Sequence, residues 1–88
     1  NQLIQHPNVA DVAVFGIPNQ EFGEEVKAVV EPTEWPINEE DMALNLKEWL
    51  RGFLSNVKIP RSIDFEKNLP RLDNGKLYKR YLQQRYKE

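Results

Sequence analysis

The fold is decided by two Val-rich stretches, VADVAVFGI at residues 9–17 and EEVKAVVE at residues 24–31. In both, apolar residues alternate with small or polar ones, which is the period-2 pattern of a β-strand. Pro18 and Gly23 lie between the two stretches, and both residue types favour a turn. Because this connection is short, we expect the two strands to pair antiparallel.

An amphipathic helix is expected after the second strand. Asn38 is a favourable N-cap, and the three residues that follow it are acidic, which the helix dipole favours in a first turn. Apolar side chains then recur at helical spacing as far as residue 54. The stripe consists of Met42, Leu46, Trp49, Leu50, Phe53 and Leu54. We expect Trp49 and Phe53 to pack in the core rather than to bind a cofactor.

Weaker signals place the remaining elements. Leu3 and Ile4 are typical of the last turn of a helix that is stopped at His6-Pro7. Residues 61–66, RSIDFE, alternate again and predict a third strand. A loop at residues 69–76 precedes a final helix at residues 77–86. One side of that helix holds Leu77, Tyr81 and Leu82. The sum is an α+β fold, (helix end)-β-β-α-β-loop-α, with helices packed on a small, mainly antiparallel three-stranded sheet.

Composition limits the class of protein. The chain has 88 residues, 40% hydrophobic and 30% charged, which is typical of one small folded domain or a piece of a larger chain; the first residue is Asn rather than Met, and we expect a fragment. The absence of Cys excludes disulfides, Cys-based zinc sites and thiol catalysis. A single His, His6, excludes a His-cluster metal site, and we expect it to be structural. No apolar run approaches the ~20 residues of a membrane span.

Charge is unevenly distributed. Residues 1–57 hold ten acidic and three basic side chains, whereas residues 58–88 hold four acidic and nine basic ones. A basic C-terminal part suggests contact with an anion, such as a nucleotide or a phosphorylated cofactor, or simply a solvated helix face. Nucleic acid is a third candidate, but the chain lacks zinc-finger spacing and an RNP pattern with interleaved aromatic residues.

The loop before the last helix carries the candidate for chemistry. Asn74 and Gly75 suit a tight turn with a positive φ, which leaves Lys76 at the tip. Arg71 and Lys79 are close in sequence and would reinforce a positive field. The Gly-Lys pair is not a phosphate-binding P-loop, because the residue five positions before it is Pro and the residue after it is Leu. Spacing alone also allows an ordinary exposed lysine.

Four ordered motifs resemble those of the adenylate-forming enzymes, which include acyl-CoA synthetases, peptide-synthetase adenylation domains and firefly luciferase. LPRLDNGKL at residues 69–77 resembles the last core motif of that family, LP-(K/R)-x-x-x-G-K-(I/L). HPNV at residues 6–9 is similar to its HPxV opening, and IPNQEFGE at residues 17–24 to its (V/I)P(D/N)…GE loop. VKIPR at residues 57–61, followed by Phe65, resembles its Y/K-x-P-(R/K)…F motif.

This resemblance implies that residues 1–88 are the small C-terminal domain of such an enzyme, with its N-terminal adenylation domain as the partner in the same chain. The implied substrates are ATP, a carboxylic acid and coenzyme A, with Mg²⁺ held by the other domain. Neither nucleic acid nor a membrane span is expected, the localisation is expected to be cytoplasmic, and the isolated domain is expected to be inactive.

The resemblance also assigns roles around the loop. Lys76 matches the adenylation lysine, which reaches the substrate carboxylate and the α-phosphate of ATP. Asn74, Gly75 and Arg71 are expected to support the loop that carries it. A residue that must leave after the first step is well placed at a loop tip. No metal ligand is expected in this chain.

Contacts with CoA are implied for other residues. Gly23 and Glu24 fall in the loop on the thioester-forming face, although a plain β-turn is an alternative. Lys58 and Arg51 are candidates to pair with CoA phosphates. Ile59 departs from the aromatic residue often found at its position, so stacking on adenine is not expected.

The residues after the Gly-Lys pair indicate the branch of the family. Peptide-synthetase domains usually continue as GKxDRR, whereas this chain reads GKLYKRYL from residue 75. That sequence is more similar to acyl-CoA ligases acting on fatty, aromatic or sterol-type acids. The alternatives are a free-standing binding or regulatory module with the same fold, and an adenylation domain that acts on a carrier-protein thiol.

Overall fold

The computed structural model describes residues 2–21, 23–55 and 58–87. Phe22 of the predicted turn and Val57 of the predicted motif lie outside these residues. The elements are η1 (Gln2–Gln5), β1 (Val9–Asn19), β2 (Gly23–Pro32), α1 (Glu39–Leu50), β3 (Ser62–Phe65) and α2 (Lys79–Tyr86). The predicted α+β class and the order of elements are confirmed.

The sheet has the order β1-β2-β3. β1 and β2 form a long antiparallel hairpin in which Val12 pairs with Val30, as the short connection predicted. β3 pairs with β2 in parallel, over residues 62–65 only, so the sheet is mixed although the longer ladder is antiparallel. The parallel pairing follows from the position of α1 in the chain, because a helical crossover returns the next strand in the same direction.

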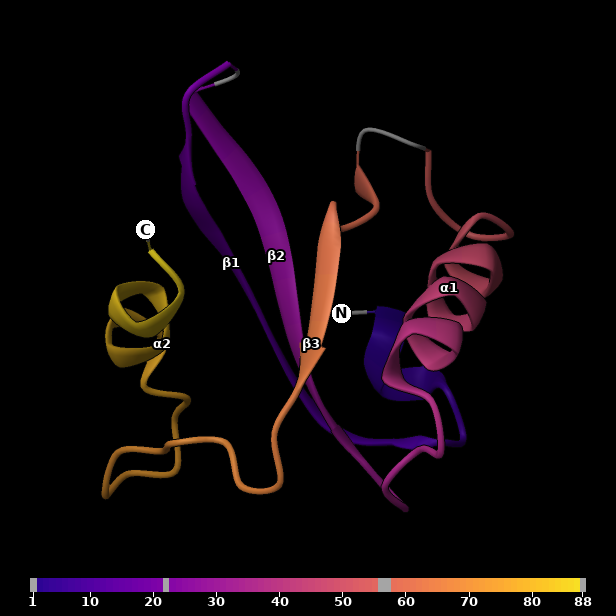
Figure 1. Cartoon of the computed structure of the whole chain (residues 1–88). Helices are drawn as coiled ribbons and strands as arrows, with labels where there is room; N and C mark the ends of the chain where they lie inside the picture. The colour runs from indigo at the N-terminus through magenta and orange to yellow at the C-terminus, as the bar shows by residue number, and fades with distance from the viewer. Residues whose placement is uncertain (1, 22, 56–57, 88) are drawn as a thin grey trace.

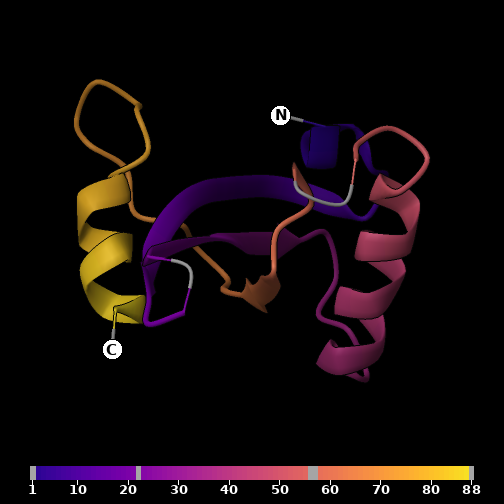
Figure 2. The same cartoon turned by 90° about the horizontal axis from the view of Figure 1, so that it is seen from above.

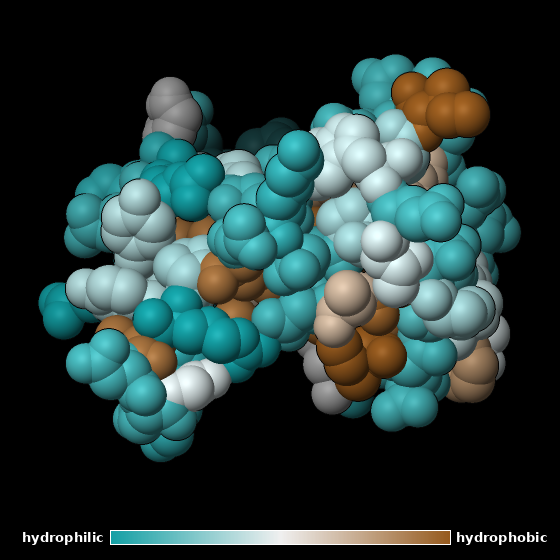
Figure 3. Space-filling model, turned by 90° about the horizontal axis from the view of Figure 1, so that it is seen from below, coloured by the Kyte–Doolittle hydropathy of each residue, from teal (hydrophilic) through white to brown (hydrophobic). Residues whose placement is uncertain are grey.

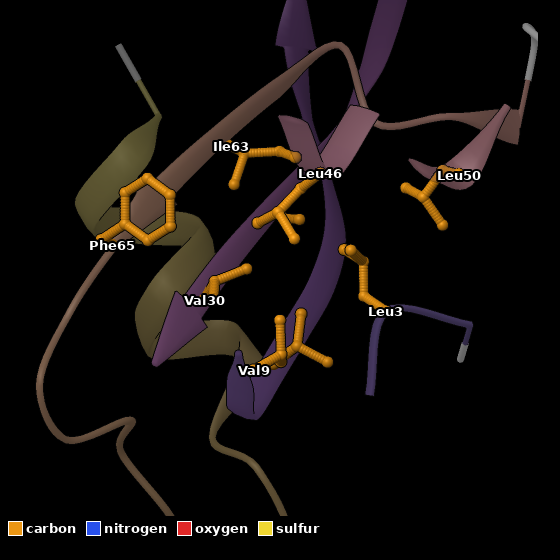
Figure 4. Packing of buried hydrophobic residues seen from close by; sticks show 9 residues of the cluster. Leu3, Val9, Val30, Leu46, Leu50, Ile63 and Phe65 are labelled. Atoms are coloured by element: carbon orange, nitrogen blue, oxygen red, sulfur yellow. The ribbon is translucent and has the colours of Figure 1, made fainter. Parts of the chain in front are cut away.

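Helices cover both faces of this sheet (Figures 1 and 2). α1 and η1 lie on one face, and the buried cluster there contains Leu3, Val9, Val12, Ala28, Val30, Leu46, Leu50, Ile63 and Phe65. α2 lies on the other face, where the buried cluster contains Ala13, Phe15, Val29, Leu69 and Leu82. Figure 4 shows Leu3, Val30 and Leu46 converging in the first cluster. Strand alternation therefore supplies apolar side chains to two separate cores.

The N-terminus of α1 is capped as predicted. The Asn38 side chain accepts a hydrogen bond from the backbone N–H of Asp41 at 3.0 Å. The expectation for the aromatic residues is only half right. Trp49 packs against the core, whereas Phe53 is 56% exposed. The helix ends at Leu50, so the chain turns away from the sheet before residue 53 is reached.

His6 has the structural setting predicted for it. Its Nδ1 accepts a hydrogen bond from the backbone N–H of Asn8 at 3.0 Å. Its ring meets the indole of Trp49 edge-on, with the centroids 4.9 Å apart. The residue therefore closes the turn between η1 and β1 and packs against α1.

The last helix is shorter than predicted. α2 begins at Lys79, and Leu77 instead forms an isolated antiparallel bridge with Arg71. Leu82 is fully buried, but Tyr81 is 47% exposed and stacks on Tyr78, so the prediction that Tyr81 shares the apolar side is wrong. In a helix this short, residues four apart share a face, and Leu82 is matched by Tyr86 rather than by Tyr81.

A polar network attaches α2 to the sheet. Lys27 of β2 is buried, with its Nζ 2.7 Å from Asp64 Oδ2 and 3.1 Å from Ser62 Oγ. The same ammonium lies 4.8 Å from the centroid of the Tyr86 ring. The Tyr86 hydroxyl donates a hydrogen bond to Glu66 at 2.5 Å. Burial, reinforced by this hydrogen bond, raises the pKa of the Tyr86 phenol well above its ordinary value.

Within the described residues, no helix has the length and apolar character needed to cross a bilayer.

Candidate functional site

The loop between β3 and α2 is an ordered hairpin. The backbone N–H of Leu72 donates to the carbonyl of Lys76 at 2.8 Å, and that of Tyr78 donates to the carbonyl of Pro70 at 2.9 Å. These two bonds close the loop on both sides of the bridge between Arg71 and Leu77. Its backbone therefore has a fixed conformation although its side chains are largely exposed.

The tip of the loop has the turn chemistry that its sequence predicted. Gly75 has a φ of +87°, and its N–H donates to the carbonyl of Leu72 at 2.9 Å. A Cβ at this glycine would meet nothing within 4 Å, so the need for glycine is conformational rather than steric. The Asn74 side chain accepts a hydrogen bond from the backbone N–H of Lys76 at 3.1 Å.

The Lys76 side chain leaves this tip into solvent. The residue is exposed, and its ammonium has no ion-pair partner among residues 2–21, 23–55 and 58–87. Figure 3, seen from below, shows a largely hydrophilic surface on the side that holds α2 and the loop before it. The Lys76 cation is thus available to an anion outside the domain.

Arg71 is paired within the domain, so it adds little to the positive field that was predicted for the loop. Its Nη2 lies 2.5 Å from Oδ2 of Asp11 on β1, and its Nη1 donates to the carbonyl of Gly75 at 2.5 Å. The Arg71 charge is therefore offset inside the domain. Sequence reasoning missed Asp11, and the only signal for it was a carboxylate within an otherwise apolar strand.

Other charges of the basic C-terminal part also find partners within the domain. Arg85 Nη2 lies 2.9 Å from Glu66 Oε2, and Nη1 lies 3.0 Å from Glu66 Oε1. The same guanidinium lies 5.5 Å from the centroid of the Tyr81 ring. Arg71 and Arg85 are therefore paired within the domain rather than left open to a phosphate.

The first pair of predicted CoA contacts lies at the β1–β2 hairpin, away from Lys76. Gly23 has a φ of +80°, and Glu24 follows it at the start of β2. The Glu24 carboxylate rests against Gly16, where the position of a Cβ would overlap it. Arg71 ties the Lys76 loop near the start of β1, and the hairpin turn follows the end of that strand. Eight residues at a rise of about 3.3 Å separate these points by roughly 26 Å.

The second pair of predicted CoA contacts follows α1. Arg51 forms an ion pair with Glu48 one turn earlier, and both side chains are exposed. The backbone N–H of Lys58 donates to the carbonyl of Ser55 at 2.9 Å. In Figure 1 the segment that contains Lys58 and the hairpin turn lie at the end of the molecule opposite the Lys76 loop. The fold therefore separates the residues predicted for the two half-reactions.

The described residues contain no group of three or more His, Asp or Glu side chains arranged to hold a metal ion. The donor set that Mg²⁺ prefers is therefore not assembled among these residues.

Known proteins resemble this chain over most of its length. Residues 1–76 match the family described as the AMP-binding enzyme C-terminal domain. A feruloyl-CoA synthase of Amycolatopsis is 36% identical over 86 residues, which are 98% of this chain and 17% of that protein. An oxalate–CoA ligase of Arabidopsis thaliana is 33% identical over 87 residues, or 98% of this chain and 16% of that protein. An ATP-bound RpMatB-BxBclM chimera superposes with a TM-score of 0.92 at 32% identity, covering 99% of this chain and 17% of the chimera.

The domain has three layers, with η1 and α1 on one face of the sheet and α2 on the other, and it carries an exposed loop lysine. The chain belongs to the family of AMP-binding enzyme C-terminal domains. It spans about a sixth of the length of the relatives that it matches.

Proposed function

We propose that this chain is the mobile C-terminal domain of an acid–CoA ligase, and that Lys76 serves the first of two half-reactions. In the first, a carboxylate oxygen attacks the α-phosphorus of ATP and pyrophosphate leaves, which gives an acyl-adenylate. In the second, the sulfur of CoA attacks the acyl carbon, AMP leaves with the bonding electrons, and the thiol proton is released. The N-terminal domain of the same chain binds ATP and the acid.

One observation carries the proposal. The Lys76 ammonium lies at the tip of a hydrogen-bonded loop and, among the residues with described positions, is not engaged in an ion pair. A cation fixed by its own domain could not be delivered to a reaction centre on another domain. An unpaired cation on an ordered support meets that requirement.

The chemistry of adenylation needs such a group. The carboxylate and the triphosphate repel each other, and negative charge accumulates on the oxygens around phosphorus in the transition state. A preorganised ammonium in a site closed to water stabilises this charge. Lys76 is the residue proposed for that role, and Asn74, Gly75 and Arg71 support the loop backbone around it.

The second half-reaction is assigned to the other end of the domain. Gly23 and Glu24 at the hairpin, with Lys58 and Arg51, are the residues proposed to approach CoA. The separation of the β1–β2 hairpin from the Lys76 loop along the sheet supports a rotation of the domain between the two steps. CoA is preferred to a carrier-protein thiol, because two matching relatives are named as a CoA synthase and a CoA ligase.

The substrate is sought with the complete enzyme. Ferulate, oxalate and a medium-chain fatty acid are each supplied with ATP, and the acyl-adenylate is trapped with hydroxylamine. The acid with the highest rate is used in the experiments that follow. Residues 1–88 alone are expected to form no acyl-adenylate, because ATP and the acid are proposed to bind the other domain.

The test of Lys76 separates the half-reactions. In the complete enzyme, Lys76→Ala is expected to lower acyl-adenylate formation by ~10²–10³-fold, the usual effect of losing one charge-stabilising group. Conversion of synthetic acyl-adenylate and CoA to the thioester should remain close to the wild-type rate. The matched control is Lys67→Ala, which removes another exposed loop lysine and should leave both rates unchanged.

Two results would contradict the proposal. Equal losses in both half-reactions would mean that Lys76 supports the domain rather than the phosphorus chemistry. Wild-type rates in both would mean that the residue is an ordinary exposed lysine. Full activity of residues 1–88 without the larger domain would refute the assignment as a partial domain and favour a free-standing module.

A further inference from the structure

An ion pair fastens the Lys76 loop to the first strand. Arg71 Nη2 and Asp11 Oδ2 are 2.5 Å apart, although 60 residues separate the two in sequence. From Nη1 the same guanidinium donates to the carbonyl oxygen of Gly75 at 2.5 Å. Arg71 therefore joins β1 to the residue immediately before Lys76.

Both ends of this connection are directional. A guanidinium is planar and presents its donors in a fixed fork, so a contact on one nitrogen sets the direction of the other. Asp11 is itself oriented, because its Oδ1 accepts a hydrogen bond from the backbone N–H of Val12 at 2.9 Å. Its side chain is only 22% exposed. The carboxylate thus acts as a fixed point on the sheet.

We propose that Asp11 is a positioning residue for acyl-adenylate formation. Through Arg71 it fixes the carbonyl of Gly75, and with it the direction in which the Lys76 side chain leaves the loop. This inference rests on the function proposed for Lys76 and adds a residue to that site. Asp11 touches neither substrate nor Lys76 in this role, and Arg71 transmits its effect.

The expected effect lies in the rate rather than in the stability of the fold. The Arg71 side chain is 43% exposed, and ion pairs with such exposure contribute little to folding. A displacement of about 1 Å at a reacting group can lower a rate by about 10²-fold. A loop that loses this contact keeps its fold and its lysine but presents the ammonium in a range of directions.

The experiment uses the complete enzyme, ATP and the carboxylate that gives the highest rate. Asp11→Asn keeps the size of the side chain and removes its charge. It is expected to lower kcat for acyl-adenylate formation by at least about tenfold through misplacement of the ammonium, with little change in the KM for ATP. Thioester formation from synthetic acyl-adenylate should stay near the wild-type rate. Asp11→Glu, which restores the carboxylate, should recover most of the lost rate.

The matched control is a structural lesion on the other face of the sheet. Asn38→Ala removes the N-cap of α1, far from the loop, and should leave the ratio of the two half-reaction rates unchanged. Hydrogen exchange provides a readout independent of activity. The Lys76 amide, which donates to Asn74, should exchange faster in Asp11→Asn and at the wild-type rate in Asn38→Ala.

The outcomes separate this inference from the function on which it rests. If Lys76→Ala lowers adenylate formation and Asp11→Asn does not, Asp11 has no positioning role and the function of Lys76 stands. If neither variant lowers it, both proposals fail. A loss that is equal in the two half-reactions, or that Asn38→Ala reproduces, shows a structural role and overturns the inference.

Discussion

Two lysines of this small domain have opposite environments. Lys27 lies on β2 under α2 with 7% of its surface exposed, and its ammonium contacts Asp64, Ser62 and the ring of Tyr86. Lys76 lies on a loop, is exposed, and has no ion-pair partner within the described part of the chain. The first cation is held by its own domain, and the second is held only through its backbone.

The difference in burial and pairing distinguishes a structural cation from one that can reach a ligand on another domain. A buried ammonium is tolerated only when partners replace its water, so its position becomes part of the fold. An exposed ammonium keeps its hydration shell and can exchange that water for a ligand bound to another domain. Charge alone therefore does not identify the candidate functional lysine. The distinguishing feature is whether the ammonium is already paired within its own domain.

The largest expected effect on stability comes from replacing Lys27, and the same substitution at Lys76 provides the comparison. Lys27→Met should lower the free energy of unfolding by about 2 kcal/mol, because charged hydrogen bonds are lost while Asp64, 45% exposed, is partly rehydrated. Lys76→Met should change it by less than about 0.5 kcal/mol. Urea unfolding of residues 1–88, followed by circular dichroism, measures both. Equal urea midpoints for Lys27→Met and Lys76→Met would show that the two lysines do not differ in their contribution to stability.

The second prediction concerns the backbone that carries Lys76. Gly75→Ala places a Cβ at a φ of +87°, which costs about 1 kcal/mol for an L-residue even though no atom obstructs it. Adenylate formation in the complete enzyme should fall as well, because the turn before the lysine relaxes. Gly52→Ala is the matched control, since a Cβ there makes only an ordinary contact of 3.5 Å with the Trp49 carbonyl. Identical behaviour of the two alanine variants would show that the turn is not required.

The third prediction concerns Tyr86, whose ring lies beside Lys27. Tyr86→Phe removes the hydrogen bond to Glu66 and should lower the free energy of unfolding by about 1 kcal/mol near neutral pH. The raised pKa of Tyr86 also predicts a pH dependence. Above about pH 10 the unfolded phenol ionises while the folded one keeps its proton, so wild-type stability declines as the pH rises.

Phe at this position has no proton to lose. The stability difference between the wild-type protein and Tyr86→Phe should therefore shrink above about pH 10, as urea titrations at a series of alkaline pH values would show. A difference that stays constant to higher pH would mean that the phenol ionises equally in both states. The conformation of the Lys76 loop should not change in Tyr86→Phe. The effects of substitutions in the two regions can therefore be measured separately.

Local patterns in the sequence were sufficient for much of the fold. Alternation predicted β1 and β2, the N-cap and the apolar stripe predicted α1, and Asn74-Gly75 predicted the turn. These features depend on residues within a few positions of one another. The roles of Lys76 and of the residues predicted to contact CoA stay predictions, because the residues with which they would react lie outside this domain.

Two aromatic residues expected to be buried are exposed in the structure. Phe53 and Tyr81 both continue a helical spacing that would place them on a buried face. The first lies beyond the end of α1, and the second lies on the side of α2 that the sheet does not cover. A periodic pattern gives the direction of a side chain relative to its own helix, but it does not say where the neighbouring element stops.

The sequence by itself determined the strands, the long helix, the turn at Gly75 and the position of a lysine beside it, because each depends on local propensity and short-range hydrogen bonds. Only the tertiary structure decided which charged side chains form ion pairs. It paired Asp11 with Arg71 and Lys27 with Asp64 across long stretches of chain, and it left Lys76 without such a partner in the described residues. An ion pair requires two groups within a few ångströms, and chain folding, not sequence spacing, brings distant residues to that distance.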